Sequence, residues 1–336
     1  MTEQYVELHC RSAFSFLRGA STPKQLAERA AQLQMPAVAL CDRDGVYGAP
    51  QFFGYARELG VRPIVGAELT MEDKTVLPVL VQSRAGYENL CQLLTRAHLR
   101  NEKGKCSVRW DELPEFANGL VALVGQEVHT APHRIEALYN IFSRDNLFVE
   151  IQRYRIRGEE RANKLRVDLA RHFRLPLLAT NGVLYAADTE RPILDVFTCI
   201  RNHTHLDAAG KLLEQNGERY LKSAAQMCEL FRDLPEAIEN TVRLAERLDF
   251  TLENLGYEFP AFAVPPGHDM NSFLRERTFA GAMKRYGEVP AKVRTQIEQE
   301  LALIEKLKVA GYFLIVWDIV EFCLQNDIMS QGRGSA

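Results

Sequence analysis

Short apolar stretches alternate with longer amphipathic ones over the first 180 residues, and this alternation limits the possible folds most strongly. The apolar runs are typical of buried strands and lie at residues 36–41, 63–69, 76–81, 120–124, 147–151 and 177–180. Apolar residues at helical spacing lie at residues 22–34, 48–59, 90–98, 135–142 and 159–173. Strand and helix in this order predict an α/β fold, here a distorted barrel, with 63–69 and 76–81 paired as a hairpin.

Polar side chains fall where four of the predicted strands end. An alternating apolar run that starts at Tyr5 supplies the first of them. The four residues are His9, Asp42, Glu68 and Asn181. The functional loops of a parallel barrel lie at the C-terminal ends of its strands. We therefore expect these side chains at one end of the barrel.

The alternation stops near residue 205, and the remainder is mainly helical. A stiff, proline-rich stretch at 259–267 cannot be helical and predicts a linker. Apolar faces at 273–286 and 293–307 predict two further helices. These changes divide the chain into an α/β module at 1–205, a mainly helical connector at 206–268 and a third module at 269–336.

The charge balance does not favour bulk attraction to nucleic acid. The 336 residues carry a formal net charge of −3, with 46% hydrophobic and 25% charged residues, as in ordinary soluble globular proteins. The most basic stretch, 153–174, holds eight lysines and arginines. It is typical of a solvated helix face with i to i+4 ion pairs, and binding to backbone phosphates is the alternative.

The cysteine pattern and the apolar runs indicate the compartment. The seven cysteines are scattered without a Cys-x-x-Cys pair, which is evidence against a zinc ribbon and for a reducing compartment. No signal peptide is visible, and no apolar run approaches the roughly 20 residues that span a bilayer. We therefore expect a cytoplasmic protein without a membrane segment.

The first motif of the chain resembles that of a known domain. Residues 8–12 read Leu-His-Cys-Arg-Ser and residues 14–19 read Phe-Ser-Phe-Leu-Arg-Gly. This resembles the start of the polymerase and histidinol phosphatase (PHP) domain that opens the alpha subunit of bacterial C-family DNA polymerases. Metal-binding members have His-x-His and a later Asp-Gly, whereas Arg11 and Arg18 replace the second histidine and the aspartate here. Because a guanidinium has no lone pair for a cation, the resemblance implies a site that has lost ligands and gained positive charge.

Four further positions depart from the metal-binding pattern of that family. Arg43 follows Asp42 where the family has a histidine. Gly182 and Leu184 stand where an aspartate and a histidine bind metal. Gln126 occupies a position where family members often carry a cysteine.

The candidate metal ligands that remain are His9, Asp42, Glu68 and His98. Hydrolytic metal sites need several neutral imidazoles and carboxylates to hold cations and activate a water. We therefore expect no bound metal, with Asp42 and Glu68 paired to the neighbouring arginines, and one weakly bound ion as the alternative. His98, at the end of an apolar helix, is more typical of a packed or capping histidine than of a ligand.

The end of the chain resembles the start of the palm of C-family polymerases. Residues 311–320 read Gly-Tyr-Phe-Leu-Ile-Val-Trp-Asp-Ile-Val, and residues 328–336 read Ile-Met-Ser-Gln-Gly-Arg-Gly-Ser-Ala. In that family the Gly-Arg-Gly-Ser motif lines the triphosphate of the incoming nucleotide, which implies nucleotide-binding roles for Gly332, Arg333, Gly334 and Ser335. Glycines let backbone N–H groups approach phosphate oxygens, and an arginine adds bidentate charge. The aspartates that bind catalytic Mg²⁺ lie further on in the family, so we expect no catalytic residue in this chain.

The resemblance covers residues 5–336, and the amino-acid sequence of the first motifs most resembles that of the error-prone branch of these alpha subunits. It implies the N-terminal part of an error-prone DNA polymerase, with a PHP-type barrel in a structural role, a helical connector and the start of the palm. The full-length protein would use Mg²⁺, primer-template DNA and deoxynucleotides in repair and translesion synthesis, with a sliding clamp and accessory proteins as partners. This part alone would be inactive. A stand-alone metal-dependent phosphoesterase and a non-catalytic binding module are the alternatives.

Overall fold

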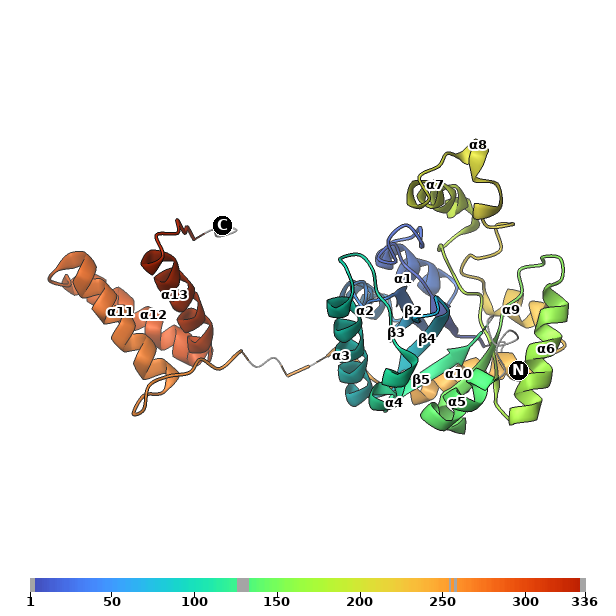
Figure 1. The fold of residues 1–336 in the computed structure, drawn as a ribbon, viewed down its shortest axis with the longest axis horizontal. Helices are drawn as coiled ribbons and strands as arrows, with labels where there is room; N and C mark the ends of the chain where they lie inside the picture. The colour runs from blue at the N-terminus through green and yellow to red at the C-terminus, as the bar shows by residue number, and fades with distance from the viewer. Residues whose placement is uncertain (1–3, 126–132, 254, 257–258, 333–336) are drawn as a thin grey trace. The chain divides into compact units, whose positions relative to one another are not determined.

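The computed structural model describes residues 4–125, 133–253, 255–256 and 259–332. The chain forms two compact units, residues 1–253 and residues 254–336. The larger unit has a curled sheet with helices around it, and the smaller unit is helical (Figure 1). Along the described residues, no helix is long and apolar enough to cross a membrane.

The sheet of the larger unit has seven strands in chain order. The strands are β1 Glu7–Cys10, β2 Ala37–Arg43, β3 Arg62–Thr70, β4 Val76–Val81, β5 Leu120–Val124, β6 Leu147–Ile151 and β7 Leu177–Ala179. Neighbouring strands are parallel except at β4, which pairs antiparallel with both β3 and β5. The predicted hairpin and the mixed α/β fold are therefore confirmed.

The sheet curls until its two edges meet. Cys10, at the end of β1, forms a parallel bridge with Val183, which follows β7. The Arg11 amide donates to the Val183 carbonyl at 2.9 Å, and the Val183 amide donates to the His9 carbonyl at 2.9 Å. The PHP-type distorted barrel predicted from the sequence is confirmed.

One face of the sheet changes from apolar to polar along the strands. Because side chains alternate across a strand, Ile64 and Glu68 share a face of β3, and Phe148 and Glu150 share a face of β6. Ile64 and Phe148 belong to a buried apolar cluster, whereas both carboxylates contact His9. Since β1, β3 and β6 are not neighbours in the sheet, these contacts cross the inside of the barrel. A polar cluster therefore lies at the C-terminal end of the strands, beyond an apolar core.

Helices cover the outside of the sheet. They are α1 Pro23–Gln32, α2 Ala49–Glu58, α3 Arg84–Arg100, α4 Leu113–Phe116, α5 His133–Phe142, α6 Glu159–Phe173, α7 Arg191–Arg201, α8 Leu206–Ala209, α9 Ala224–Leu230 and α10 Pro235–Arg247. α1 begins at a capping box in which Thr22 and Gln25 satisfy each other's backbone N–H groups. The apolar faces of these helices and the outward side chains of the strands form the main core.

The beginning of the expected connector packs against the sheet. α10 contacts β7 and β1, and its Leu244 and Ala245 join the apolar cluster inside the barrel. The Asn240 side chain donates to the Leu177 carbonyl at 2.8 Å, and the Thr241 hydroxyl accepts from the Val6 amide at 3.2 Å. Residues 206–253 thus belong to the larger compact unit.

The smaller unit consists of three helices, α11 Met270–Tyr286, α12 Ala291–Lys306 and α13 Ala310–Gln325. Its core is small and centres on Phe273, Leu274, Ala310 and Leu314. Gly311 lies against the stretch at 259–267, because a Cβ on Gly311 would come within 2.5 Å of the Pro260 carbonyl oxygen. The expected linker has no helix or strand, and part of it packs on α13.

Candidate functional site

His9 is the centre of the polar cluster at the end of the barrel. The side chain is buried, and both ring nitrogens contact carboxylates, Nε2 with Glu68 at 2.6 Å and Nδ1 with Glu150 at 2.7 Å. A carboxylate only accepts hydrogen bonds, so both nitrogens donate and the ring is an imidazolium. Burial alone would lower the pKa of His9, but the charges and hydrogen bonds of Glu150 and Glu68 raise it to about 9. His9 therefore has no free nitrogen for a metal ion.

Glu68 holds three cations with one carboxylate. Oε1 accepts from His9 and from Arg11, whose Nε lies 2.6 Å away, and Oε2 accepts from Nε of Arg43 at 2.7 Å. Glu68 is fully buried, and burial would raise its pKa, but the two arginines and His9 hold that pKa well below its usual range. The pairing that we expected between Glu68 and arginines is present.

Asp42 does not pair with an arginine, so that part of the expectation is wrong. Its Oδ1 accepts from the Ser12 amide at 2.8 Å and the Ser15 hydroxyl at 2.6 Å, and its Oδ2 accepts from the Ser12 hydroxyl at 2.8 Å. Burial raises the pKa of Asp42, although these hydrogen bonds oppose it. The reason is geometric: the turn after β1 places Ser12 and Ser15 next to this carboxylate, and their hydrogen bonds take both of its oxygens.

Glu150 and its neighbours are functional-site residues that the sequence analysis did not single out. Besides His9, Glu150 accepts from the Thr180 hydroxyl at 2.5 Å, and Gln152 donates to the same hydroxyl at 3.0 Å. Burial would raise the pKa of Glu150, but the charge of His9 lowers it. A signal existed, because Glu150 is the only charged residue of the buried strand at 147–151.

Glu7 is a further buried carboxyl group, and its contacts to the backbone of His9 and Asn181 place it next to this cluster. Its pKa is raised, whereas the pKa values of Glu68 and Glu150 are lowered. Its carboxyl group accepts from the Tyr5 hydroxyl at 2.7 Å and from the amides of His9 and Asn181 at 2.9 Å each. Burial is the largest effect and raises the pKa of Glu7 to about 7. Asn181, expected at the end of the barrel, binds the carbonyls of Glu218 and Tyr220 through its amide nitrogen and takes no part in a ligand set.

His98 lies outside the cluster. It is on α3, and its Nε2 donates to the Asp44 carbonyl at 2.7 Å. Gln126, another position considered from the sequence, lies outside the described residues. Of the four candidate ligands, the structure therefore brings His9 and Glu68 together and gives Asp42 and His98 other partners.

The space for a missing metal ligand is occupied. Gly182 has a φ of +48°, and a Cβ there would lie 2.6 Å from Gln152 Nε2 and from the Tyr154 hydroxyl, and 2.9 Å from Arg219 Nη2. Leu184 is buried in an apolar cluster. Within the described ranges, no group of three or more His, Cys, Asp or Glu side chains has a geometry that could hold a metal ion. The residues present do not fit a PHP metal centre.

Most of the Gly-Arg-Gly-Ser motif, for which we predict nucleotide binding, lies outside the described residues. Gly332 is exposed and a Cβ there would meet no atom within 4 Å, whereas Arg333, Gly334 and Ser335 lie outside the described residues. Their nucleotide-binding role stays a prediction.

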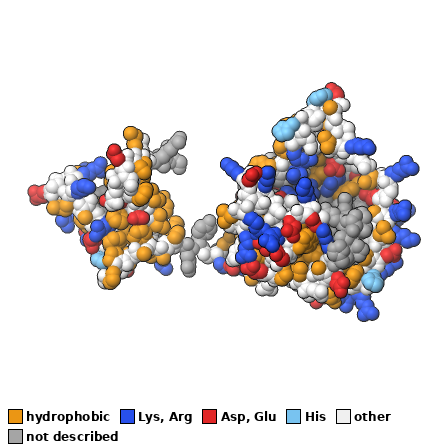
Figure 2. Space-filling view, viewed as in Figure 1, with side chains coloured by type: hydrophobic (Ala, Val, Ile, Leu, Met, Phe, Trp, Pro, Cys, Tyr) orange, Lys and Arg blue, Asp and Glu red, His pale blue; other side chains and the backbone are white. Residues whose placement is uncertain are grey.

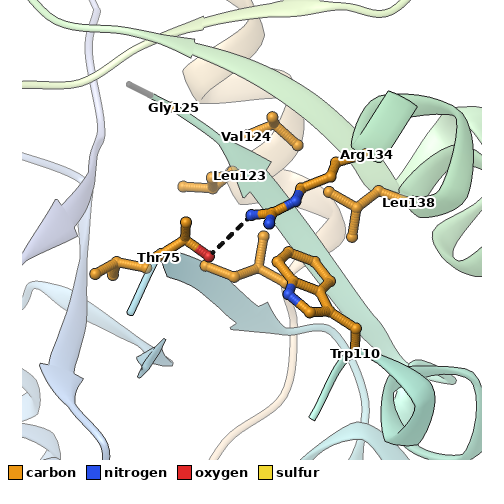
Figure 3. Close-up of a pocket in the computed structure, with 9 residues that line it drawn as sticks. Thr75, Trp110, Leu123, Val124, Gly125, Arg134 and Leu138 are labelled. Atoms are coloured by element: carbon orange, nitrogen blue, oxygen red, sulfur yellow. Dashed lines mark hydrogen bonds between the residues drawn. The ribbon is translucent and has the colours of Figure 1, made fainter. Parts of the chain in front are cut away.

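A second recess lies beside the barrel, between β4, β5 and α5 (Figure 3). The Arg134 guanidinium points into it, donates to the Thr75 hydroxyl at 3.5 Å and lies 4.9 Å from the centre of the Trp110 ring. Arg134 also forms an ion pair with Asp73, which accepts from the Trp110 indole at 3.1 Å. These polar groups satisfy one another, which indicates a packing role.

Two domain families match this chain. Residues 7–154 match the PHP domain, and residues 272–336 match the bacterial DNA polymerase III alpha NTPase domain. The PHP match therefore lies in the larger unit, which has the curled sheet and the polar cluster at the strand ends, and the polymerase III alpha match lies in the smaller unit.

Curated relatives match along the whole chain. The error-prone DNA polymerase of Bradyrhizobium diazoefficiens is 36% identical over 100% of this chain and 30% of its own length. That of Pseudomonas aeruginosa is 39% identical over 99% of this chain and 32% of its own length. The chain carries matches to the PHP and bacterial DNA polymerase III alpha domains, is similar along its whole length to error-prone DNA polymerases, and spans about a third of the length of the curated relatives it matches. The family resemblance read from the motifs is confirmed.

A solved structure resembles part of this chain. An amidohydrolase from Chromobacterium violaceum, with bound SO4 and no metal, is 14% identical with a TM-score of 0.39, over 54% of this chain and 88% of that chain.

Proposed function

We propose that this chain is the N-terminal part of a DNA-directed DNA polymerase that acts in error-prone repair and translesion synthesis. The two family matches and the relatives named error-prone DNA polymerase support this proposal. The whole protein would bind primer-template DNA and deoxynucleotides, use Mg²⁺ for nucleotidyl transfer, and work with a sliding clamp and accessory proteins. Within it, residues 1–205 would form the PHP domain, 206–268 the connector and 269–336 the start of the palm, with Gly332 to Ser335 at the nucleotide.

The PHP domain would be structural in this polymerase. The observation that carries this proposal is the Glu68 carboxylate, whose oxygens are taken by Arg11, Arg43 and His9. Removing one partner from buried ion pairs of this kind is strongly destabilising, so the Glu68 carboxylate holds together the strands that contribute its partners. Both of its oxygens already have side-chain cations, and not a metal ion, as partners. The cluster thus joins β1, β2 and β3 where metal ligands would otherwise join them.

The smaller unit supports a role inside a larger assembly. α13 carries large apolar side chains with high exposure, including Ile319 at 57%, Phe322 at 60% and Leu324 at 64%. Figure 2 shows hydrophobic side chains gathered over this unit. Soluble proteins bury apolar patches of this kind against other elements. We propose that α13 packs against further parts of the polymerase.

Primer extension tests the proposed function. The whole polymerase should extend a primed template, and this chain alone should not. A structural PHP domain also predicts that the purified chain, after incubation with Mn²⁺ or Zn²⁺, retains no stoichiometric metal on gel filtration and hydrolyses no generic phosphate ester. Hydrolysis that depends on His9 would contradict the structural role and favour a phosphoesterase. Pull-down with a purified sliding clamp tests the proposed partner.

A further inference from the structure

A basic recess lies where strands β6 and β7 begin. Three segments line it: the helical turn Arg144–Asn146 directly before β6, residues 174–176 between α6 and β7, and α10. Because β6 and β7 are parallel, their first residues lie at one edge of the sheet, away from the polar cluster at the C-terminal strand ends. The volume is about 380 Å³, within the range of small-molecule sites, roughly 300–1,000 Å³. We call it the N-terminal recess, and four arginines line it, Arg144, Arg174, Arg243 and Arg247.

The lining of the N-terminal recess has a surplus of positive charge. Besides the four arginines, it contains one carboxylate, that of Asp145. Glu239 lies outside the lining and offsets part of the surplus, because it accepts from Nη2 of Arg243 at 2.9 Å. Guanidinium groups stay protonated at any ordinary pH, so the surplus persists. A ligand that neutralises this recess must therefore carry at least two negative charges.

Many guanidinium nitrogens of this recess lack a hydrogen-bond partner within the described ranges of the chain. Arg174 is exposed, and no described residue forms a hydrogen bond or ion pair with its side chain. Arg144 uses only Nε, which donates to the Arg174 carbonyl at 2.9 Å. Arg243 uses only Nη2, on Glu239. Unused N–H donors therefore come from all three segments of the lining.

The hydrogen bonds that these arginines do make join the three segments. Arg247 on α10 donates to the Asp145 carbonyl through Nη1 and to the Asn146 side chain through Nη2, at 2.7 Å each. Arg144 joins the turn before β6 to the segment before β7 through its contact with the Arg174 carbonyl. The recess is thus formed before a ligand arrives, which lowers the cost of ordering on binding.

We propose that the N-terminal recess binds the linked phosphate groups of a small ligand, a nucleoside triphosphate or inorganic polyphosphate. A guanidinium presents paired N–H donors that match phosphate oxygens. Linked phosphates share a bridging oxygen, so a compact ligand brings several negative charges to one place, which suits a closely spaced set of arginines. The carboxylates of an extended acidic peptide are spread more widely, because only every second side chain faces one side. Pro176, half-buried beside the arginines, offers an apolar contact to the rest of a nucleotide.

Isothermal titration calorimetry of this chain with inorganic tripolyphosphate tests the proposal, at fixed pH and ionic strength and without divalent cations. Arg174→Gly should weaken the affinity about tenfold or more, as expected for the loss of charged hydrogen bonds. This variant should fold, because Arg174 has a left-handed φ of +54° that glycine adopts without strain. Arg243→Gln removes a donor from another segment and should weaken the affinity as well. Its exposed pair with Glu239 adds little to stability, so this variant should also fold.

Arg171→Gln is the matched control. Arg171 is exposed one turn earlier on α6, outside the recess, and its loss changes the net charge by the same amount as each of the other variants. This control should bind tripolyphosphate like the wild type. Absence of binding by the wild type would overturn the proposal. Equal affinities of the wild type, Arg174→Gly and Arg243→Gln would also overturn it, because the phosphate would then bind elsewhere on the chain.

Further ligands identify the source of the phosphate groups. If ATP binds more tightly than tripolyphosphate and Arg174→Gly weakens its binding, the ligand is a nucleotide whose nucleoside also contacts the recess. Equal affinities for the two would show that the phosphate chain alone is recognised, as in inorganic polyphosphate. Hexaglutamate and a single-stranded oligonucleotide complete the set. Tighter, Arg174-dependent binding of either one would contradict a small phosphate ligand and identify an extended polyanion.

Discussion

Nε2 of His9 donates a hydrogen bond to Oε1 of Glu68 at 2.6 Å, across the inside of the barrel. The imidazole and the carboxylate, the residue types that hold metal ions in other PHP domains, hold each other in this chain. Arg11 donates to the same oxygen of this carboxylate, and Arg43 donates to the other oxygen. The result is a charged contact that joins β1, β2 and β3 at their C-terminal ends.

Replacing Glu68 by alanine should destabilise the larger unit strongly. The substitution leaves His9, Arg11 and Arg43 as buried or half-buried cations without their common partner, and breaking a buried ion pair in this way costs about 3–5 kcal/mol. Urea unfolding of the purified chain measures the change. Glu115→Ala is the matched control, because Glu115 forms a two-point contact with Arg96 at the surface and its removal should change stability little. An unchanged midpoint for Glu68→Ala would exclude a structural role for the cluster.

Stability should fall as the pH rises from about 6.5 to about 9. The pKa of His9 is raised to about 9 in the folded chain from 6.5. The stabilisation from the imidazolium is therefore complete below the unfolded pKa and is lost as the pH rises through the folded pKa. At about 1.4 kcal/mol per pKa unit, the loss approaches roughly 3 kcal/mol.

Urea unfolding at several pH values measures this loss, with His9→Gln as the control. Glutamine does not titrate, so the pH dependence above the unfolded pKa of histidine should flatten in this variant. The pKa of Glu7, raised by burial from 4.5 to about 7, adds a loss of the same sign at lower pH in both proteins. A wild-type profile that is flat up to pH 9 would mean that His9 is not an imidazolium.

Gly182→Ala should lower stability by about 1 kcal/mol or more, because the left-handed φ of +48° disfavours a Cβ. The added carbon would also come within 2.6 Å of Gln152 and Tyr154, which must then move. Gly54→Ala is the control, since Gly54 lies within α2 and a Cβ there meets nothing within 4 Å. In denaturant unfolding, the free energy of unfolding should be higher for Gly54→Ala than for the wild type, and lower for Gly182→Ala. The reverse order would indicate that the space at residue 182 remains open for a ligand.

The double variant Ile319→Lys and Phe322→Lys tests the packing proposed for α13. Both side chains are exposed in this chain, so the variant should stay folded, as measured by circular dichroism, and self-associate less in sedimentation velocity. In the whole polymerase the same change should reduce stability, since lysines would replace buried apolar side chains. A whole polymerase that tolerates both lysines would show that this face remains exposed. Lys292→Arg on α12 is the control variant. It keeps an exposed cation, so its folding and self-association should equal those of the wild type.

Local patterns predicted most of the elements of the larger unit. α6, Glu159–Phe173, has the bounds expected from its helical spacing, and the hairpin of β3 and β4 was expected from two apolar runs with a short turn between them. These features depend on neighbours a few residues apart, which the sequence displays directly. The arginines at positions 11 and 43 were equally visible, and the resemblance to the PHP domain implies that they replace metal ligands.

The partners inside the barrel were not predictable in this way. Glu150 meets His9 from 141 positions away, and Arg219 enters the space beside Gly182 from another segment. Asp42, expected to bind an arginine, binds two serines that the turn after β1 places closer. A sequence shows which charges exist, whereas their pairing depends on distances that appear only after the strands are arranged around the barrel.

The amino-acid sequence by itself determined the order of the strands and helices, because this order follows from residue type and local spacing. Its motifs carried the resemblance to the PHP and polymerase III alpha family, which implies that arginines replace metal ligands here. Only the tertiary structure decided that His9 is charged, that Glu68 has three cationic partners, and that Arg11, Arg43 and Arg219 line one recess. The physical reason is burial. Removing these groups from water makes each charge depend on the charges a few ångströms away, and those neighbours come from strands that are remote in the chain.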